Sequence, residues 1–321
     1  MRVRWWGADI KVASRERISN RPASGRAVGQ VRGYSAILTA AALFGASATV
    51  GTVLMRSLGL HPIAALILVH SVASLPFIPV ALRQRPRRAD LRIFLLWGLN
   101  GAAFAPFLWF YGLSLTTATE AALLANLEAL FTVLFAYAFL HERVPRRGYF
   151  GIAALLVGAV AVTTNFDFVT FGFTAHLAGN SMLILSSACF GIDNNVSRIL
   201  IQRYDRRGIP FFKLWIGLAA VIPIALLAGI PFAVSTPMVP YIVLLGLGSV
   251  TGVMWFFYIA FEEIGAIRTG ALISTSALFG VAIAFAAFGT PPTAVQFGGG
   301  LLMVAGTLLT LESKATAKAA G

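Results

Sequence analysis

The chain has 321 residues, of which 58% are hydrophobic and 12% charged, and its mean hydropathy is +0.82. Soluble domains carry about a quarter charged residues, so this composition excludes an ordinary soluble protein. The net charge of +13 would suit a nucleic-acid partner, but the basic residues lie where a membrane protein places them, and no nucleic-acid function is expected.

The chain opens with a basic segment, residues 1–35, which holds eight Lys or Arg residues and no apolar run. It does not resemble a cleaved signal peptide, because the apolar stretch that starts near Ala36 is too long for a signal-peptide core. We predict a disordered cytoplasmic extension. A start codon assigned too early would produce the same segment.

Apolar runs of about 20 residues follow, the length that a helix needs to cross a bilayer, and Gly, Pro and charged residues separate them. We predict ten membrane-spanning helices, near residues 36–56, 63–82, 91–113, 118–140, 147–164, 176–200, 210–232, 239–261, 267–288 and 293–311. All 25 Lys and Arg residues except Arg56 then fall on the side of the N-terminus, the loop 198–213 included. Cytoplasmic loops are rich in Lys and Arg, so both termini are predicted to be cytoplasmic.

The sequence repeats itself at an offset of 148 residues, where AALLANLEALFTVLFAY aligns with GALISTSALFGVAIAF and GIAALLVGAV with GGLLMVAGTL. Gly151 and Gly158 recur as Gly299 and Gly306. We therefore predict a five-helix unit over residues 36–164, a second over 174–312, and a cytoplasmic tail over 313–321. Since five is odd, the second unit must enter the membrane upside down relative to the first.

Several phrases point to one family: ALFGASATVG in the first predicted helix, NLEALF in the fourth, ACFGIDNNVSRIL in the sixth and FYIAFEEIGAIRTGALISTSALFG toward the ninth. Over roughly residues 36–312 the chain resembles the EamA family of the drug/metabolite transporter (DMT) superfamily. The resemblance implies an all-α integral membrane protein of the bacterial inner (plasma) membrane, with ten transmembrane helices in two inverted five-helix repeats. It also implies efflux of amino acids or related metabolites.

One carboxylate, Glu128, lies in the middle of the fourth predicted helix, roughly 13.5 Å along the axis from Thr119. An ionisable residue at this depth is by default a candidate for function. We expect Glu128 to bind a proton or a cationic group of the substrate. The structural alternative is a buried carboxyl that hydrogen-bonds a neighbouring helix. No Lys or Arg is expected close to it, because the basic residues are assigned to cytoplasmic loops.

Asp193, Asn194 and Asn195 form a second candidate cluster, on the sixth predicted helix. Three consecutive side chains span about 200° of a helix, so at most two of them face one cavity. The alternative is that Asp193 balances Arg198 and the two Asn residues tie helices together.

Two hydroxyls on the ninth predicted helix complete the transport-path candidates. Ser276 occupies the repeat position of Glu128, and Ser274 lies two residues before it. Hydroxyls in spanning helices often bond their own backbone, so helix packing is the alternative for both.

We predict no catalytic residues, cofactor or metal, because the four His residues are scattered, Cys189 has no partner and no nucleotide-binding loop is present. The chain is expected to be a secondary transporter that works by alternating access, with a small-molecule substrate and lipid as its partners. Proton coupling and uncoupled exchange both stay open. An intramembrane enzyme or a non-transporting scaffold is the alternative class.

Overall fold

The computed structural model describes residues 2–5, 8–11, 23–140, 146–164, 166, 176–200, 203–205, 207–264, 269, 272–273, 275–289 and 291–319. Strands β1 (Arg2–Trp5) and β2 (Ala8–Lys11) pair antiparallel, with Arg2 opposite Lys11, inside the segment for which disorder was predicted. The remaining regular elements in the described part of the chain are helices. The first of them begins at Ala23, earlier than the predicted start near residue 36.

The helices occupy the predicted apolar segments. The first half contains α1 (Ala23–Thr52), η1 (Val53–Ser57), α2 (Pro62–Ser74), η2 (Leu75–Phe77), α3 (Ile78–Ala81), η3 (Arg88–Asp90), α4 (Leu91–Gly98), η4 (Leu99–Phe104), α5 (Ala105–Leu115), α6 (Ala118–Leu124), α7 (Leu127–Leu140) and α8 (Arg146–Thr164). The second half contains α9 (Leu177–Leu200), α10 (Ile209–Leu227), η6 (Thr236–Met238), α11 (Val239–Val243), η7 (Leu244–Gly252), α12 (Val253–Ile264), α14 (Ser276–Phe288) and α15 (Ala294–Ala319). Of the η elements, η1, η4 and η7 are π-helices.

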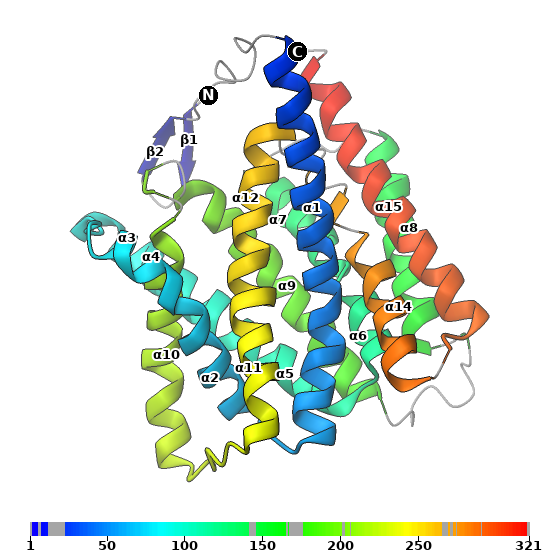
Figure 1. Cartoon of the computed structure of the whole chain (residues 1–321). Helices are drawn as coiled ribbons and strands as arrows, with labels where there is room; N and C mark the ends of the chain where they lie inside the picture. The colour runs from blue at the N-terminus through cyan, green and yellow to red at the C-terminus, as the bar shows by residue number, and fades with distance from the viewer. Residues whose placement is uncertain are drawn as a thin grey trace.

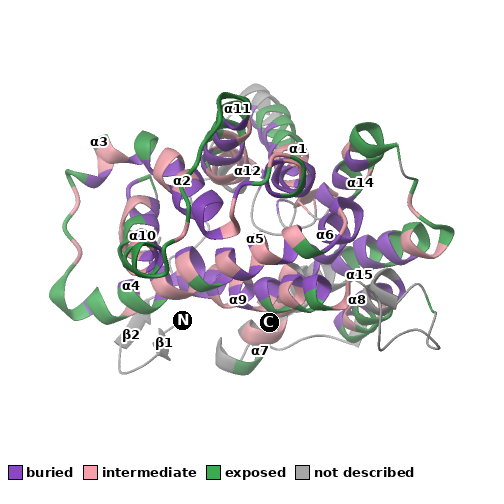
Figure 2. Cartoon of the chain, turned by 90° about the horizontal axis from the view of Figure 1, so that it is seen from below, coloured by how far each residue is buried: buried purple, intermediate pink, exposed green. Residues whose placement is uncertain are grey.

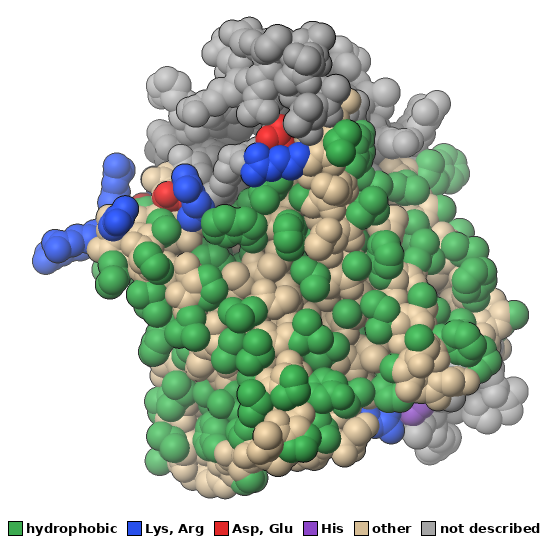
Figure 3. All heavy atoms as spheres, in the orientation of Figure 1, with side chains coloured by type: hydrophobic (Ala, Val, Ile, Leu, Met, Phe, Trp, Pro, Cys, Tyr) green, Lys and Arg blue, Asp and Glu red, His purple; other side chains and the backbone are tan. Residues whose placement is uncertain are grey.

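Several continuous helical stretches are long and apolar enough to cross a membrane. In the described residues these are Gly29–Ser57, Pro62–Ala81, Arg88–Leu115, Ile209–Leu227 and Thr236–Ala260. Large apolar side chains cover much of the outer surface, as Figure 3 shows, and Leu227 is 90% exposed and Phe150 73% exposed. Such a surface is matched by lipid rather than by water. The chain is therefore a helical, multi-pass membrane protein.

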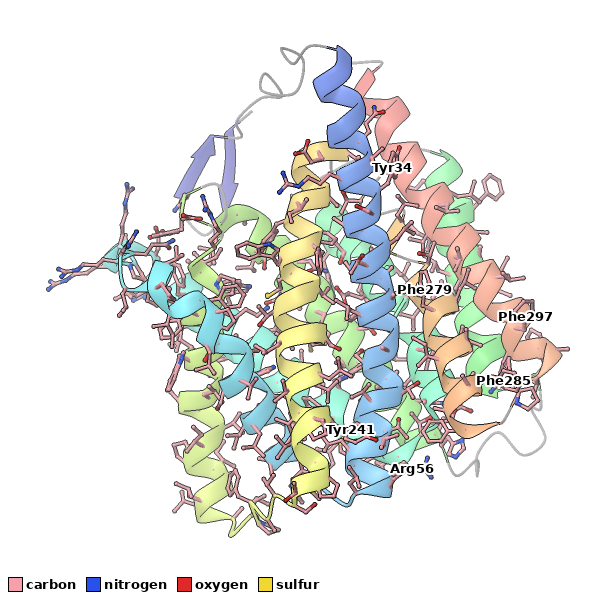
Figure 4. The ribbon with its side chains drawn as sticks, in the orientation of Figure 1. Tyr34, Arg56, Tyr241, Phe279, Phe285 and Phe297 are labelled. Carbon is pink, nitrogen blue, oxygen red and sulfur yellow. The ribbon has the colours of Figure 1, made fainter. Side chains whose placement is uncertain are left out.

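The charged side chains are unevenly distributed along the long axis of the molecule. Helix α1 begins and α15 ends at the same end, at the top of Figure 1. On the face seen in Figure 3, the described Lys and Arg side chains gather mainly at this end, near α3 and α4. Arg56, at the end of η1, lies at the other end (Figure 4). We call these two ends the basic end and the opposite end.

The helices pack around a core of buried side chains that face between them, while exposed residues lie on the outside (Figure 2). Helix α8 packs along α15, and several other contacts between the two halves occur twice, with the halves exchanged. Helix α1 contacts α12 and α14, as α9 contacts α5 and α7. Helix α10 contacts the π-helix η4, as α2 contacts the π-helix η7.

Glycines bring α8 and α15 into backbone contact, and they do so reciprocally. A Cβ added to Gly158 would lie 2.6 Å from the carbonyl oxygen of Gly299, and one added to Gly306 would lie 2.6 Å from that of Gly151. These are the four glycines that the sequence repeat aligns. Because each contact leaves no space for a methyl group, both positions require glycine.

We expect Gly158→Ala and Gly306→Ala each to lower the free energy of unfolding by about 1–3 kcal/mol, because the added Cβ forces α8 and α15 apart. Gly298→Ala is the matched control on α15, since its Cβ would meet no atom within 4 Å. Thermal unfolding of the purified protein in detergent measures all three. Equal effects at Gly158 and Gly298 would show that the close helix contact is not required.

Candidate functional site

Helix α9 crosses close to α7 at Gly191, where a Cβ would lie 2.7 Å from Phe131 Cβ and 2.8 Å from the Thr132 nitrogen. Residues three and four positions along a helix share its face, so Asn194 and Asn195 also lie toward α7. The close approach at one glycine therefore places the two amides against the carboxylate-bearing helix.

Glu128 hydrogen-bonds across this contact. Asn194 Nδ2 donates to Glu128 Oε1 at 2.7 Å and lies 3.2 Å from the Thr132 hydroxyl. Asn195 Nδ2 donates to the Thr132 carbonyl at 3.0 Å and to the Gly191 carbonyl at 2.9 Å. Glu128 is partly buried, and this contact joins α7 of the first half to α9 of the second.

Asp193 lies on the other side of α9 and forms an ion pair with Lys213 of α10. The Nζ to Oδ2 distance is 2.6 Å, and the Lys213 and Asp193 side chains are only 7% and 6% exposed. The expectation that no Lys or Arg lies in the interior is therefore wrong. Pro210 starts α10 within its first turn, so Lys213 belongs to a spanning helix and not to the loop 198–213. The alternative partner of Asp193, Arg198, has a side chain outside the described part.

The pair is possible because α10 packs closely on the π-helix η4. Gly98 faces Ile216, and Gly217 faces the backbone of Ala102, with a Cβ at either position too close to its neighbour. A Cβ at Gly101 would overlap Asp193 Oδ1 and approach Lys213 Cε to 2.9 Å. Glycine at 101 therefore leaves the space that the ion pair occupies.

Further polar groups surround the pair. The Lys213 ammonium lies 5.2 Å from the centroid of the Trp97 ring, and the Trp97 indole donates to Ser197 Oγ at 3.0 Å. Asn100 donates to the Cys189 carbonyl at 2.8 Å, which ties η4 to α9. His70 of α2 is buried, and its Nδ1 has no hydrogen-bond partner among the described residues.

Six residues make up what we call the interior cluster: Glu128, Thr132, Asp193, Asn194, Asn195 and Lys213. Glu128 lies within electrostatic range of both Asp193 and Lys213. The charge of Asp193 is balanced by Lys213, while the carboxyl of Glu128 is bonded only to the amide of Asn194 among the described side chains. The Glu128 carboxyl can therefore exchange a proton or bind a cation. Chemically, the cluster can bind charged groups of a solute inside a low-dielectric protein.

The predicted serines do not join this cluster in the described residues. Ser276 is buried at the start of α14, and its backbone carbonyl lies against Gly45 of α1. Ser274 is outside the described residues. The roles of both in a transport path stay predictions.

At the basic end, an ion pair and hydrogen bonds link the two halves, and we call such a set of contacts a polar tie. Asp90 accepts from Arg203 Nη1 at 2.8 Å and from the Tyr204 hydroxyl at 2.7 Å. Burial raises the pKa of Tyr204, which keeps its phenol protonated as a donor. Gln84 adds a bond to the Asp205 carbonyl at 3.0 Å.

A second polar tie lies at the opposite end, around Glu120. Its carboxylate accepts from Thr116 at 2.5 Å and from Gln296 of α15 at 3.4 Å, and lies 3.4 Å from His176 Nδ1. The sequence interpretation missed Glu120, although T-x-x-E from Thr117 marks a helix start, where the Thr117 hydroxyl accepts from the Glu120 nitrogen.

An apolar pocket of about 260 Å³ opens between α6, α14 and α15, lined by Leu123, Val281, Phe285, Pro292 and Phe297 among others. Phe285 and Phe297 lie on the outer side of the bundle in Figure 4. The pocket contains no residue of the interior cluster. Among the described residues, no group of three or more His, Cys, Asp and Glu side chains could hold a metal ion.

Ionisable residues inside a helical multi-pass membrane protein are typical of ion and substrate pathways, so the interior cluster indicates a membrane transporter. The model of the EamA-like transporter family matches residues 31–164 and again residues 177–312. The chain therefore belongs to the EamA-like transporter family, a family of transporters and not of enzymes.

Similar proteins carry transporter names. An uncharacterized transporter of Methanothermobacter thermautotrophicus is 30% identical, over 90% of this chain and 88% of that protein. A probable terminal-alkyne amino-acid exporter of Streptantibioticus cattleyicolor is 26% identical, over 70% and 75%. A pseudopaline exporter of Pseudomonas aeruginosa is 24% identical, over 71% and 77%. A solved crystal structure, 20% identical, has the same fold, with a TM-score of 0.60 over 91% of this chain and 99% of that one.

Proposed function

We propose that the protein is a secondary transporter that exports small metabolites such as amino acids, by alternating access between two inverted five-helix halves. One observation carries this proposal: the carboxyl of Glu128, from the first half, is bonded to Asn194, from the second half, inside the bundle. Transporters built from repeats bind their substrates between the repeats, near the midplane. Relatives that are named as amino-acid and pseudopaline exporters support the choice of substrate class.

Reciprocal contacts support the inverted ten-helix arrangement. Gly191 meets Phe131 and Thr132, and Gly45 meets Phe279 and Gly280. The offset of 148 aligns Phe131 with Phe279 and Thr132 with Gly280. The glycine contacts of α8 and α15 are exchanged in the same way. A contact that occurs twice with its partners exchanged is what a two-fold axis between the halves produces.

The uneven charge supports an orientation with both termini in the cytoplasm of a bacterial cell, across the inner membrane. A fluorescent reporter fused after Gly321 should then mature in the cytoplasm, and a tag in the loop 164–173 should be accessible only from outside. A C-terminus on the outer side would require an odd number of spans and would contradict the inverted halves.

Transport itself is tested in proteoliposomes with a panel of radiolabelled amino acids, amines and organic acids, with and without an imposed pH gradient. We expect protein-dependent movement of at least one amino-acid-type compound, and a change in its rate with the gradient if protons are coupled. Fluxes equal to those of empty liposomes across the whole panel would contradict the proposal.

A further inference from the structure

The Asp193–Lys213 ion pair is buried deeply for a spanning region, and its bonding capacity is not used up. Asp193 Oδ1 is buried without a hydrogen-bond partner. The Trp97 indole, which is close to this carboxylate, donates to Ser197 at 3.0 Å instead. The Lys213 ammonium has three protons, and the hydrogen bond to Asp193 uses one of them. If the buried pair only stabilised the packing, its remaining hydrogen-bond donors and acceptors should have partners in the protein.

The backbone opposite the pair also departs from regular structure. Residues Leu99–Phe104 form the π-helix η4, and π-helical segments inside α-helices are frequent at functional sites. Gly101 of this segment presents no side chain to Asp193 and Lys213. The pair fills the space beside the Gly101 backbone, so a solute could take this position only by separating Asp193 from Lys213.

Charge balance restricts the kind of solute that could do so. A buried charge that loses its partner is strongly unfavourable. A simple amine would pair with Asp193 and leave Lys213 unpaired, while a simple carboxylate would leave Asp193 unpaired. A solute with both charges replaces one ion pair with two and leaves no charge unpaired.

We propose that Lys213 binds the carboxylate, and Asp193 the ammonium group, of a zwitterionic amino-acid-type substrate, which separates the ion pair when it binds. This proposal rests on the proposed transport function and names its substrate class. Without substrate, Asp193 takes the place of the substrate carboxylate beside Lys213, and Lys213 takes the place of the substrate ammonium group beside Asp193. Lys213 is four residues from the start of α10, about 6 Å along the helix axis, so the site lies toward the basic end. That is the cytoplasmic side in the proposed orientation, where an exporter collects its substrate.

The test is thermal stabilisation of the purified full-length protein by three matched sets of probes. These are the standard L-amino acids, their amides, which keep only the positive charge, and their deaminated acids, which keep only the negative charge. We expect at least one amino acid to raise the melting temperature, and its amide and deaminated acid to give no comparable shift. Equal shifts from an amide or a deaminated acid, or no shift with any amino acid, would overturn the proposal.

A double variant tests the residues themselves. Asp193→Leu with Lys213→Met removes both charges and should abolish the shift given by the amino acid. Asp90→Leu with Arg203→Met removes the ion pair of the basic end and should keep it. A shift that survives in the first variant would overturn the proposal. If that variant does not fold, the comparison of the three probe sets on the unmodified protein still tests the proposal.

The outcomes separate this proposal from the transport function. Transport of an amine or organic acid, without binding of any amino acid, would support the transport function and contradict the zwitterion site. Binding of an amino acid without flux in proteoliposomes would support the site and contradict transport.

Discussion

Replacing Glu128 with glutamine should abolish the response of transport to a pH gradient while the protein stays folded and inserted. Glutamine keeps the shape of the protonated carboxyl and an oxygen that can accept from Asn194, whose amide lies 2.7 Å from Oε1 in the wild type. It cannot release a proton. Uptake by the variant should therefore run at the same rate with and without the gradient, whereas Glu128→Asp, which still titrates, should be less affected.

The measurement is initial uptake in proteoliposomes at matched protein content. Glu120→Gln is the matched control, because it removes a carboxyl from the tie at the opposite end and leaves the interior cluster intact. The control should keep its response to the gradient. If Glu128→Gln responds to the gradient as the wild type does, Glu128 is structural, and the coupling role moves to Asp193 or is abandoned.

Breaking the interior ion pair on one side should be the most destabilising single change in the cluster. Lys213→Met leaves Asp193 buried without its partner, and the loss of one member of a buried pair costs about 3–5 kcal/mol. Adding Asp193→Leu should recover most of that loss, because an apolar pair of similar volume is often as stable as the ion pair. Unfolding of the single and double variants in detergent gives the comparison. Equal stability of the two variants would mean that the charges are not coupled as the 2.6 Å distance indicates.

The sequence predicted the helical segments well because long apolar runs leave few alternatives. The recurrence of Gly151 and Gly158 as Gly299 and Gly306 was visible in the sequence, but their close contact was not predicted, because a repeat offset does not show which helices pack together. The π-helices η4 and η7 could not be predicted, because no residue pattern distinguishes a π-helical turn from an α-helical one in an apolar run.

The sequence singled out several residues of the interior cluster, and the roles given to them stay predictions. Glu128 and Asn194 were chosen because polar groups are costly in lipid, and the structure brings their side chains together. Lys213 was missed because basic residues near a loop were all counted with the loop. The signal that could have found it is Pro210, which marks the first turn of α10 and places Lys213 inside the helix, four residues after its start at Ile209. Glu120 was missed because its distant partners, Gln296 and His176, depend on tertiary packing.

The central claim is that the interior cluster lines the route of the substrate, and thiol accessibility tests it most directly. Glu128→Cys in a Cys189→Ser background is treated with a small water-soluble thiol reagent in proteoliposomes. Leu156→Cys, which is 51% exposed in the middle of α8, is the lipid-facing control. We expect the thiol at position 128 to react, and to react more slowly with the amino acid that stabilises the protein, while the control stays unmodified. A thiol at position 128 that is inert, or that reacts at the same rate with and without that amino acid, would contradict the claim.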